Sequence, residues 1–230
     1  MKDYYIAFDS LNKERNDVLE YMIGHQIEII NHAKKAKCYE LYSSSADDLG
    51  ILTPSLIRDK TTSGYHKGRR LKQVPLKGGY VLYEFDNTMK PLRIRNYTKK
   101  GHLDFTFYFI NYNDALFAIP CGGNRPLYIY PTALHKIEYR KGKIWKYSTI
   151  TSNSVWQEVY DFEQNDYVEC RNYYYVSKSV GRNKNLLKEE SSFSLQTWLA
   201  KIYMNEGKIL RLLYYNISNN EEELIYEYRK

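Results

Sequence analysis

A cysteine beside two glycines is the first feature of the sequence that could support chemistry. Cys121-Gly122-Gly123 follows Pro120 in a turn-like segment. A thiolate next to flexible backbone N–H groups can attack a carbonyl carbon, and those groups can stabilise the resulting oxyanion, with His102 or His135 as the base. The spacing matches no known cysteine-hydrolase signature, and turns use glycine for conformational reasons alone. A cysteine-dependent enzyme using Cys121 is therefore kept as an alternative function only.

Two histidines and a glutamate recur at helical spacing near the N-terminus. His25, Glu28 and His32 would share one face of a helix, and imidazole and carboxylate groups are zinc ligands. The two histidines, however, are separated by about 10.5 Å of helix rise, whereas metal-binding helices place their ligands four residues apart. We interpret the three residues as a solvated polar face and predict no metal and no other cofactor.

The strongest local signal is a basic segment between residues 58 and 77. It contains seven Lys and Arg residues against one acid, in a chain of 230 residues whose net charge is +7. Almost all of the excess positive charge therefore lies in one segment, where it attracts an anionic partner. Glycines and ring side chains in the segment would allow close approach to such a partner. The predicted partner-binding residues are Arg58, Lys60, Tyr65, His66, Lys67, Arg69, Arg70, Lys72 and Lys77.

Three interpretations of the basic segment stay open. It is a solvated loop whose charge favours solubility, a contact surface for an acidic protein, or a nucleic-acid-binding element that uses residues 58–77. Of the two binding interpretations, an acidic protein partner is preferred, and a nucleic-acid-binding module is the first alternative function.

Composition limits the class of protein. Hydrophobic residues make up 43% of the chain and charged residues 27%, which excludes wholesale disorder, and the 25 tyrosines favour β-sheet. No signal peptide opens the sequence, and no apolar run reaches the roughly 18 residues of a membrane-spanning helix. Three cysteines are too few for a disulfide framework. We expect a cytoplasmic protein with no membrane partner, and the oligomeric state stays open.

The elements that position these residues follow from periodicity. Apolar residues recur three, four and seven apart from Leu11 to Ile30, which predicts an amphipathic helix that Asp9 or Ser10 caps. Residues 40–77 lack a sustained period and predict an irregular connector. From Gly78 onward the pattern has a period of two, as in Leu103–Phe109, and polar turns such as Lys141-Gly142 and Asn205-Glu206-Gly207 separate the strands.

The expected fold class is α+β and β-rich: an N-terminal amphipathic helix followed by a large, antiparallel, twisted sheet built as a meander of hairpins. Residues 1–77 form the helix and the basic connector, and residues 78–230 form the β-meander domain, together one unit. The helix stripe is expected to cover one face of the sheet.

Successive strands share a pattern of an aromatic residue, an acid, a polar turn, a lysine and an apolar residue. Parts of this pattern occur in Tyr160-Asp161-Phe162, in Tyr83-Glu84-Phe85-Asp86-Asn87 and in Gly207-Lys208-Ile209-Leu210. Residues 80–228 thereby resemble the tyrosine-rich β-meanders of immunity proteins from bacterial polymorphic toxin systems, and are also similar to degenerate YD-type repeats of Rhs proteins. The resemblance implies a non-enzymatic, cytoplasmic protein that neutralises a toxin by covering it. Because the charge is basic, the expected toxin presents an acidic surface.

Overall fold

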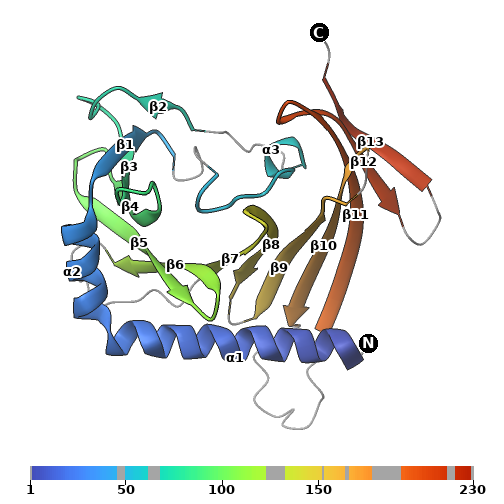
Figure 1. The fold of residues 1–230 in the computed structure, drawn as a ribbon, viewed down its shortest axis with the longest axis horizontal. Helices are drawn as coiled ribbons and strands as arrows, with labels where there is room; N and C mark the ends of the chain where they lie inside the picture. Colours follow the sequence, from blue (N-terminus) through green and yellow to red (C-terminus); the bar gives the residue numbers. More distant parts are fainter. Residues whose placement is uncertain are drawn as a thin grey trace, which may run out of the picture.

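One antiparallel sheet of 13 strands dominates the described part of the chain. The computed structural model describes residues 2–45, 50–61, 68–122, 133–151, 153–163, 166–177, 193–216 and 221–228. Within these ranges two N-terminal helices precede the sheet, so the predicted α+β, β-rich class is confirmed. The sheet bends into a trough, which Figure 1 shows end-on.

Helices α1 (Lys2–Gly24) and α2 (Gln26–Ala36) open the chain, and the one-turn helix α3 (Arg58–Thr61) follows the first strand. None of the described helices is long and apolar enough to cross a membrane. The strands are β1 (Tyr39–Ser43), β2 (Arg70–Leu71), β3 (Tyr80–Phe85), β4 (Pro91–Tyr97), β5 (Leu103–Tyr112), β6 (Ala115–Gly122), β7 (Leu134–Arg140), β8 (Lys143–Ile150), β9 (Ser154–Asp161), β10 (Val168–Ser177), β11 (Phe193–Asn205), β12 (Lys208–Asn216) and β13 (Glu221–Glu227).

From β3 to β13 the spatial order of the strands is the order of the sequence, as expected of a meander. The β7–β8 connection is Lys141-Gly142 and the β11–β12 connection is Glu206-Gly207, and all four residues have positive φ. Two consecutive positive φ values define the tight hairpin turn whose twist matches that of the flanking strands. These two predicted hairpins are therefore confirmed.

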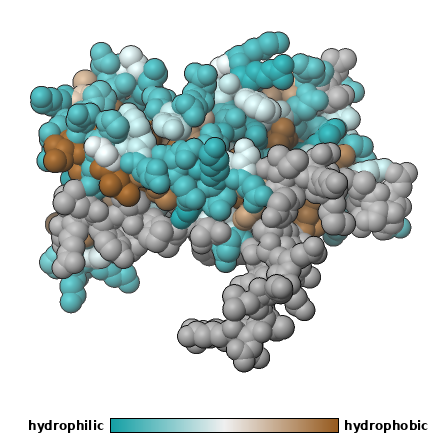
Figure 2. Space-filling model, turned by 90° about the horizontal axis from the view of Figure 1, so that it is seen from below, coloured by the Kyte–Doolittle hydropathy of each residue, from teal (hydrophilic) through white to brown (hydrophobic). Residues whose placement is uncertain are grey.

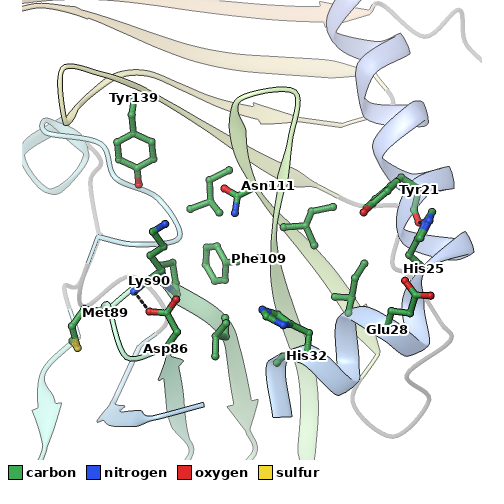
Figure 3. A pocket seen from close by; sticks show the side chains of 16 residues that line it. Tyr21, His25, Glu28, His32, Asp86, Met89, Lys90, Phe109, Asn111 and Tyr139 are labelled. Atoms are coloured by element: carbon green, nitrogen blue, oxygen red, sulfur yellow. Dashed lines mark hydrogen bonds between the residues drawn. The ribbon is translucent and has the colours of Figure 1, made fainter. Parts of the chain in front are cut away.

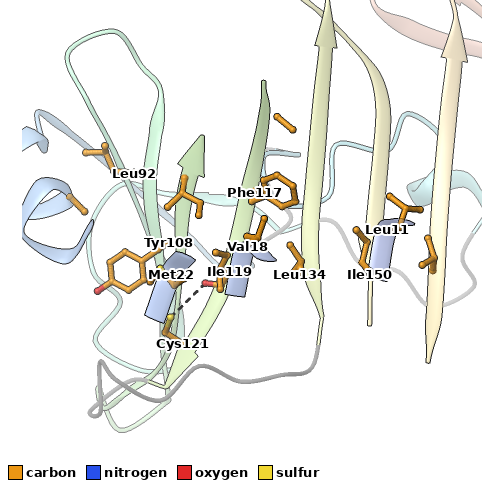
Figure 4. Packing of buried hydrophobic residues seen from close by; sticks show 14 of the residues in the cluster. Leu11, Val18, Met22, Leu92, Tyr108, Phe117, Ile119, Cys121, Leu134 and Ile150 are labelled. Carbon is orange, nitrogen blue, oxygen red and sulfur yellow. Dashed lines mark hydrogen bonds between the residues drawn. The ribbon is translucent and has the colours of Figure 1, made fainter. Parts of the chain in front are cut away.

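The face of the sheet that packs against α1 and α2 is here called the helix face. Phe8, Leu11, Val18 and Met22 of α1 are buried against β5 to β10 (Figure 4). Their partners include Phe117, Ile119, Leu134, Ile150 and Val155. At roughly 25 cal/mol per Å² of apolar surface, this burial is a major source of stability. The prediction that the helix stripe covers one sheet face is confirmed for α1.

The single predicted helix is in fact two. The helical stretch begins at Lys2, so Asp9 and Ser10 lie inside it and cap nothing, and it breaks at His25. Ile23, before the break, and Ile27, after it, are 65% and 70% exposed, whereas Ile30 of the expected stripe packs against the core of the helix face. Figure 2 shows an apolar patch at the left end of the molecule, the end at which α1 meets α2 in Figure 1.

The opposite face is here called the connector face, because residues 50–61 lie along it inside the trough (Figure 1). Leu52 packs against Val81, Tyr83 and Ile94 at one arm of the trough. Ile57 packs against a second cluster that β9 to β12 build at the other arm. The prediction of an irregular connector over 40–77 is thus wrong in part: β1, α3 and β2 all fall within that range, because tertiary packing orders a segment without a sustained period.

Glu158 fastens the connector to the sheet. Its side chain is buried and accepts hydrogen bonds from Ser55 Oγ at 2.9 Å, from Trp156 Nε1 at 3.0 Å and from the Tyr160 hydroxyl. The Tyr160 hydroxyl in turn accepts a hydrogen bond from the backbone N–H of Leu56 at 2.9 Å. The three hydrogen bonds that Glu158 accepts offset the cost of burying its carboxylate. Two hydrogen bonds, from Ser55 to Glu158 and from Leu56 to Tyr160, attach the connector to the sheet.

Replacing Glu158 with Gln tests this attachment. We expect the free energy of unfolding to fall by about 1–3 kcal/mol, because an amide cannot accept hydrogen bonds from all three donors. Urea denaturation measures the change, and limited proteolysis reports whether residues 50–61 become cleavable. The exposed Glu163→Gln variant serves as the control and should leave both readouts unchanged. Wild-type stability in the Glu158→Gln variant would contradict the assigned role.

Candidate functional site

The structure divides the predicted basic segment into two groups. Arg58 and Lys60 belong to α3, at the connector face, where the Lys60 ammonium lies 4.4 Å from the centre of the Tyr226 ring. Arg69, Arg70, Lys72 and Lys77 instead are exposed along and beyond the edge strand β2. Tyr65, His66 and Lys67 lie outside the described residues. The six described members of the predicted segment therefore fall into two groups.

Backbone contacts fix the exposed group in place. The carbonyl of Arg69 accepts a hydrogen bond from the backbone N–H of Ser44 at 3.0 Å, and the backbone N–H of Arg69 donates to Ser44 Oγ at 2.9 Å. Arg70 pairs with Ser43 in the β1–β2 ladder. These contacts tie the segment to the sheet, so the basic residues are presented from an ordered edge.

Two lysines of the β4–β5 turn extend this surface. A Cβ on Gly79 would lie 2.8 Å from the carbonyl oxygen of Tyr97 and 3.7 Å from the backbone nitrogen of Lys99, so the two segments lie side by side. Lys99 and Lys100 are exposed there. We call the six exposed residues Arg69, Arg70, Lys72, Lys77, Lys99 and Lys100 the basic rim. Lys99 and Lys100 are not among the residues predicted from the sequence, although the meander expected from Gly78 onward was a signal that could have found them.

Four cations of the basic rim have no ion-pair partner among the described residues. Among the residues that the structure describes, no carboxylate lies within 4.0 Å of Arg69, Arg70, Lys72 or Lys77. By contrast, the nearby Arg95 forms an ion pair with Glu84, because its Nε donates a hydrogen bond to Glu84 Oε2 at 3.0 Å. Positive charge at the rim is therefore available to a partner.

A row of aromatic rings begins beside the rim, on the helix face. The Tyr80 ring stacks on the Tyr97 ring at a centroid distance of 4.6 Å, and the Tyr42 ring lies 6.1 Å from that of Tyr80. The Arg95 guanidinium lies 5.7 Å from the centre of the Tyr97 ring. Large, half-buried rings next to exposed cations provide both apolar contact area and charge.

A pocket of about 800 Å³ lies between α2, the β3–β4 turn and strands β5 and β6 (Figure 3). His25, Glu28 and His32 line its helical side, and all three are exposed. His25 Nδ1 lies 2.9 Å from the Tyr21 carbonyl, which can only accept, so Nδ1 carries a hydrogen. Among the described residues, no cluster of three or more His, Cys, Asp or Glu is arranged to hold a metal ion.

Cys121 lies in the interior of the protein. Its side chain is fully buried on the helix face beside Met22 and Ile119 (Figure 4), and burial raises the pKa of its thiol to about 12. His135 projects from the opposite face, and His102 is exposed outside the strands. Because a thiol nucleophile needs a lowered pKa and access, this geometry gives no support to the cysteine-dependent alternative.

His135 belongs to a buried polar group on the connector face. Its Nδ1 lies 2.9 Å from the Tyr147 hydroxyl and 3.2 Å from Thr149 Oγ1. Burial and, to a smaller extent, the positive charge of Arg58 lower the pKa of His135 to about 4. The imidazole is thus neutral at pH 7 and serves packing and hydrogen bonding under the connector.

Comparison with known proteins identifies no relative: no family model matches the sequence, and no curated protein or solved structure matches it.

Thiol labelling tests the cysteine assignments. In the folded protein, iodoacetamide should alkylate the exposed Cys38 and leave the buried Cys121 and Cys170 unmodified, because burial raises both thiol pKa values and blocks the reagent. Peptide mass spectrometry measures the modified sites, and labelling in urea provides the control in which all three react. Rapid labelling of Cys121 in the native state would restore the nucleophile hypothesis.

His135 also predicts a pH dependence of stability. Its pKa falls from 6.5 to about 4 on folding, so the unfolded chain takes up the proton first as the pH decreases. The free energy of unfolding should therefore decline between about pH 6.5 and pH 4, by up to about 3 kcal/mol from this group. Urea denaturation at several pH values measures the slope. The slope should shrink in His135→Gln and persist in His102→Gln, and an unchanged slope in His135→Gln would contradict the assignment.

Proposed function

We propose that the chain is a non-enzymatic protein-binding protein whose basic rim engages an acidic surface of a partner protein. The observation that carries this proposal is the basic rim itself: exposed cations, tied to a sheet edge by backbone hydrogen bonds, without carboxylate partners among the described residues. Charges that are paired within a protein contribute little to a partner, whereas unpaired charges accelerate encounter and select partners by complementarity.

The finer proposal is that the partner is a bacterial toxin and that this chain is its immunity protein. It rests on the resemblance of the tyrosine-rich meander to such proteins and on the form of the surface. Arg69 and Arg70 combine charge with a planar group that binds carboxylates in pairs of hydrogen bonds. Tyr80 and Tyr97 add rigid apolar area beside them. Arg and Tyr are the residue types that contribute most to interface energy, and covering a toxin's working surface requires no chemistry from the inhibitor.

A nucleic-acid-binding module is the second candidate function, and one observation favours it. The Tyr42, Tyr80 and Tyr97 rings form a row beside the basic rim, and single-stranded nucleic acids bind to stacked aromatic side chains flanked by cations. The protein partner is preferred because these rings are only partly exposed and contact one another, which leaves limited ring surface for bases.

Charge reversal at the rim tests the proposal. The double variant Arg69→Glu/Arg70→Glu should bind an acidic partner at least about tenfold more weakly while keeping the thermal stability of the wild type, because both side chains are exposed. The control is Arg140→Glu/Lys141→Glu, which makes the same charge change at the exposed β7–β8 turn. Glu is tolerated there, since Glu206 occupies the corresponding position with φ near that of Lys141.

Immobilised wild-type and variant proteins would be used to capture partners from nuclease-treated lysate of the source cells. The captured protein would then be purified, its affinity measured by calorimetry, and its toxicity measured with and without co-expression of this chain. Equal capture by the wild type and the rim variant would refute the role of the rim. Tight binding of a single-stranded oligonucleotide, with a steep salt dependence that the rim variant loses, would favour the second candidate.

A further inference from the structure

The pocket between α2, the β3–β4 turn and strands β5 and β6 has the features of a small-molecule site. Its volume of about 800 Å³ lies within the range of about 300–1,000 Å³ that is typical of such sites. Phe109 is buried on the connector face, Leu116 packs in the same cluster, and these two residues form an apolar floor. Leu116 is half-buried, and the polar residues Lys90, Asn111 and Tyr139 at the margin are exposed, so an apolar body could lie beside this floor without any rearrangement of the fold.

Hydrogen-bond donors converge above this floor. Figure 3 shows the side chains of Lys90, Asn111 and Tyr139 directed toward the space around Phe109. Lys90 has no ion-pair partner among the described residues, and Asn111 is exposed. Burial raises the pKa of Tyr139, so its hydroxyl keeps its proton and can donate. One cation and two neutral donors therefore face the same volume.

The two carboxylates of the pocket lie at its margins. Asp86 is committed to its own turn, because its Oδ1 accepts hydrogen bonds from the backbone N–H groups of Thr88 and Lys90 and from Thr88 Oγ1. Those bonds lower the pKa of Asp86. Glu28 lies on α2 beside His25, across the pocket from Lys90 (Figure 3). Lys90 is the cationic side chain among those that line the pocket, and it faces the space around Phe109.

We propose that this pocket binds a small molecule with an apolar body and a single carboxylate. The apolar body lies on Phe109 and Leu116, and the carboxylate accepts hydrogen bonds from Lys90, Asn111 and Tyr139. A phosphate is a poorer fit, because sites for dianions generally use a helix N-terminus or several cations, and only one lysine points inward here. This inference is independent of the proposed function, since none of these residues belongs to the basic rim.

Three probes with one apolar body isolate the role of the charge. Naphthalene-2-carboxylate, naphthalene-2-carboxamide and 2-naphthylmethylammonium would be titrated into the full chain at pH 7 by isothermal calorimetry. The carboxylate should bind about tenfold more tightly than the carboxamide, as expected for charge-assisted hydrogen bonds in a partly exposed site. The ammonium probe should bind most weakly, because it places its charge beside Lys90.

Variants locate the binding. Lys90→Met keeps the length of the side chain and removes its charge, so it should abolish the preference for the carboxylate while leaving carboxamide binding intact. Tyr139→Phe should weaken carboxylate binding several-fold, because only the hydroxyl is lost. Lys13→Met removes one exposed lysine outside both the pocket and the basic rim and should change nothing. All three positions are exposed, so the variants are expected to fold, and thermal denaturation verifies this.

Four outcomes would overturn the proposal: no heat of binding at millimolar carboxylate, equal affinity for all three probes, tighter binding of the ammonium, or an unchanged preference in Lys90→Met. If none of the probes binds but Lys90→Met weakens the protein partner captured through the basic rim, the pocket belongs to the protein interface instead. Loss of the rim interaction with intact probe binding would refute the proposed function and leave this inference standing.

Discussion

Both faces of one sheet have to be covered, and this constraint governs the rest of the structure. A sheet of 13 strands with apolar residues on both faces cannot leave either face in water. The N-terminal part of the chain supplies both covers: α1 and α2 pack on the helix face, and residues 50–61 pack on the connector face. The chain therefore passes from one face to the other by way of β1, which lies next to the edge strand β2.

Buried charge fixes the alignment of these layers. Glu84, which is fully buried on the helix face, accepts hydrogen bonds from the guanidinium groups of Arg93 and Arg95 on the next strand. A shift of one residue in the β3–β4 register would turn Glu84 to the connector face and separate it from both arginines. Glu158 performs the corresponding task on the connector face, where it holds Ser55. The two polar clusters thus fix the β3–β4 register and the position of the connector on the sheet, which apolar packing alone would not determine.

The two proposed binding regions follow from the passage of the chain around the edge. Because β1 lies between β3 and β2, the connector leaves β1, crosses the trough and returns to the same edge, where its basic residues are exposed. The break at His25 lets α2 turn away from α1, and the space between α2 and the β3–β4 turn becomes the pocket. Edge strand β13 carries three consecutive exposed glutamates, which discourage pairing with another sheet.

The sequence by itself determined the local structure. Period-two alternation identified the strands from β3 onward, because side chains of a strand alternate between faces, and Gly142 and Gly207 marked hairpins because their turns require positive φ. The apolar spacing around Val18 and Met22 likewise identified the buried side of α1. Each of these signals arises from neighbours within a few residues, so no knowledge of the fold was needed.

Only the tertiary structure decided which distant residues meet. It turned Ile23 and Ile27 outward, placed Cys121 under α1 and His135 on the opposite face, separated Arg58 from Arg69, and brought Lys99 to the rim. It also brought Lys90, Asn111 and Tyr139 around one pocket from three separate strand ends and turns. Such contacts depend on how the whole sheet curves and which segment crosses each face. Local periodicity carries no information on either, because those choices are settled by the burial of surfaces that lie far apart in the chain.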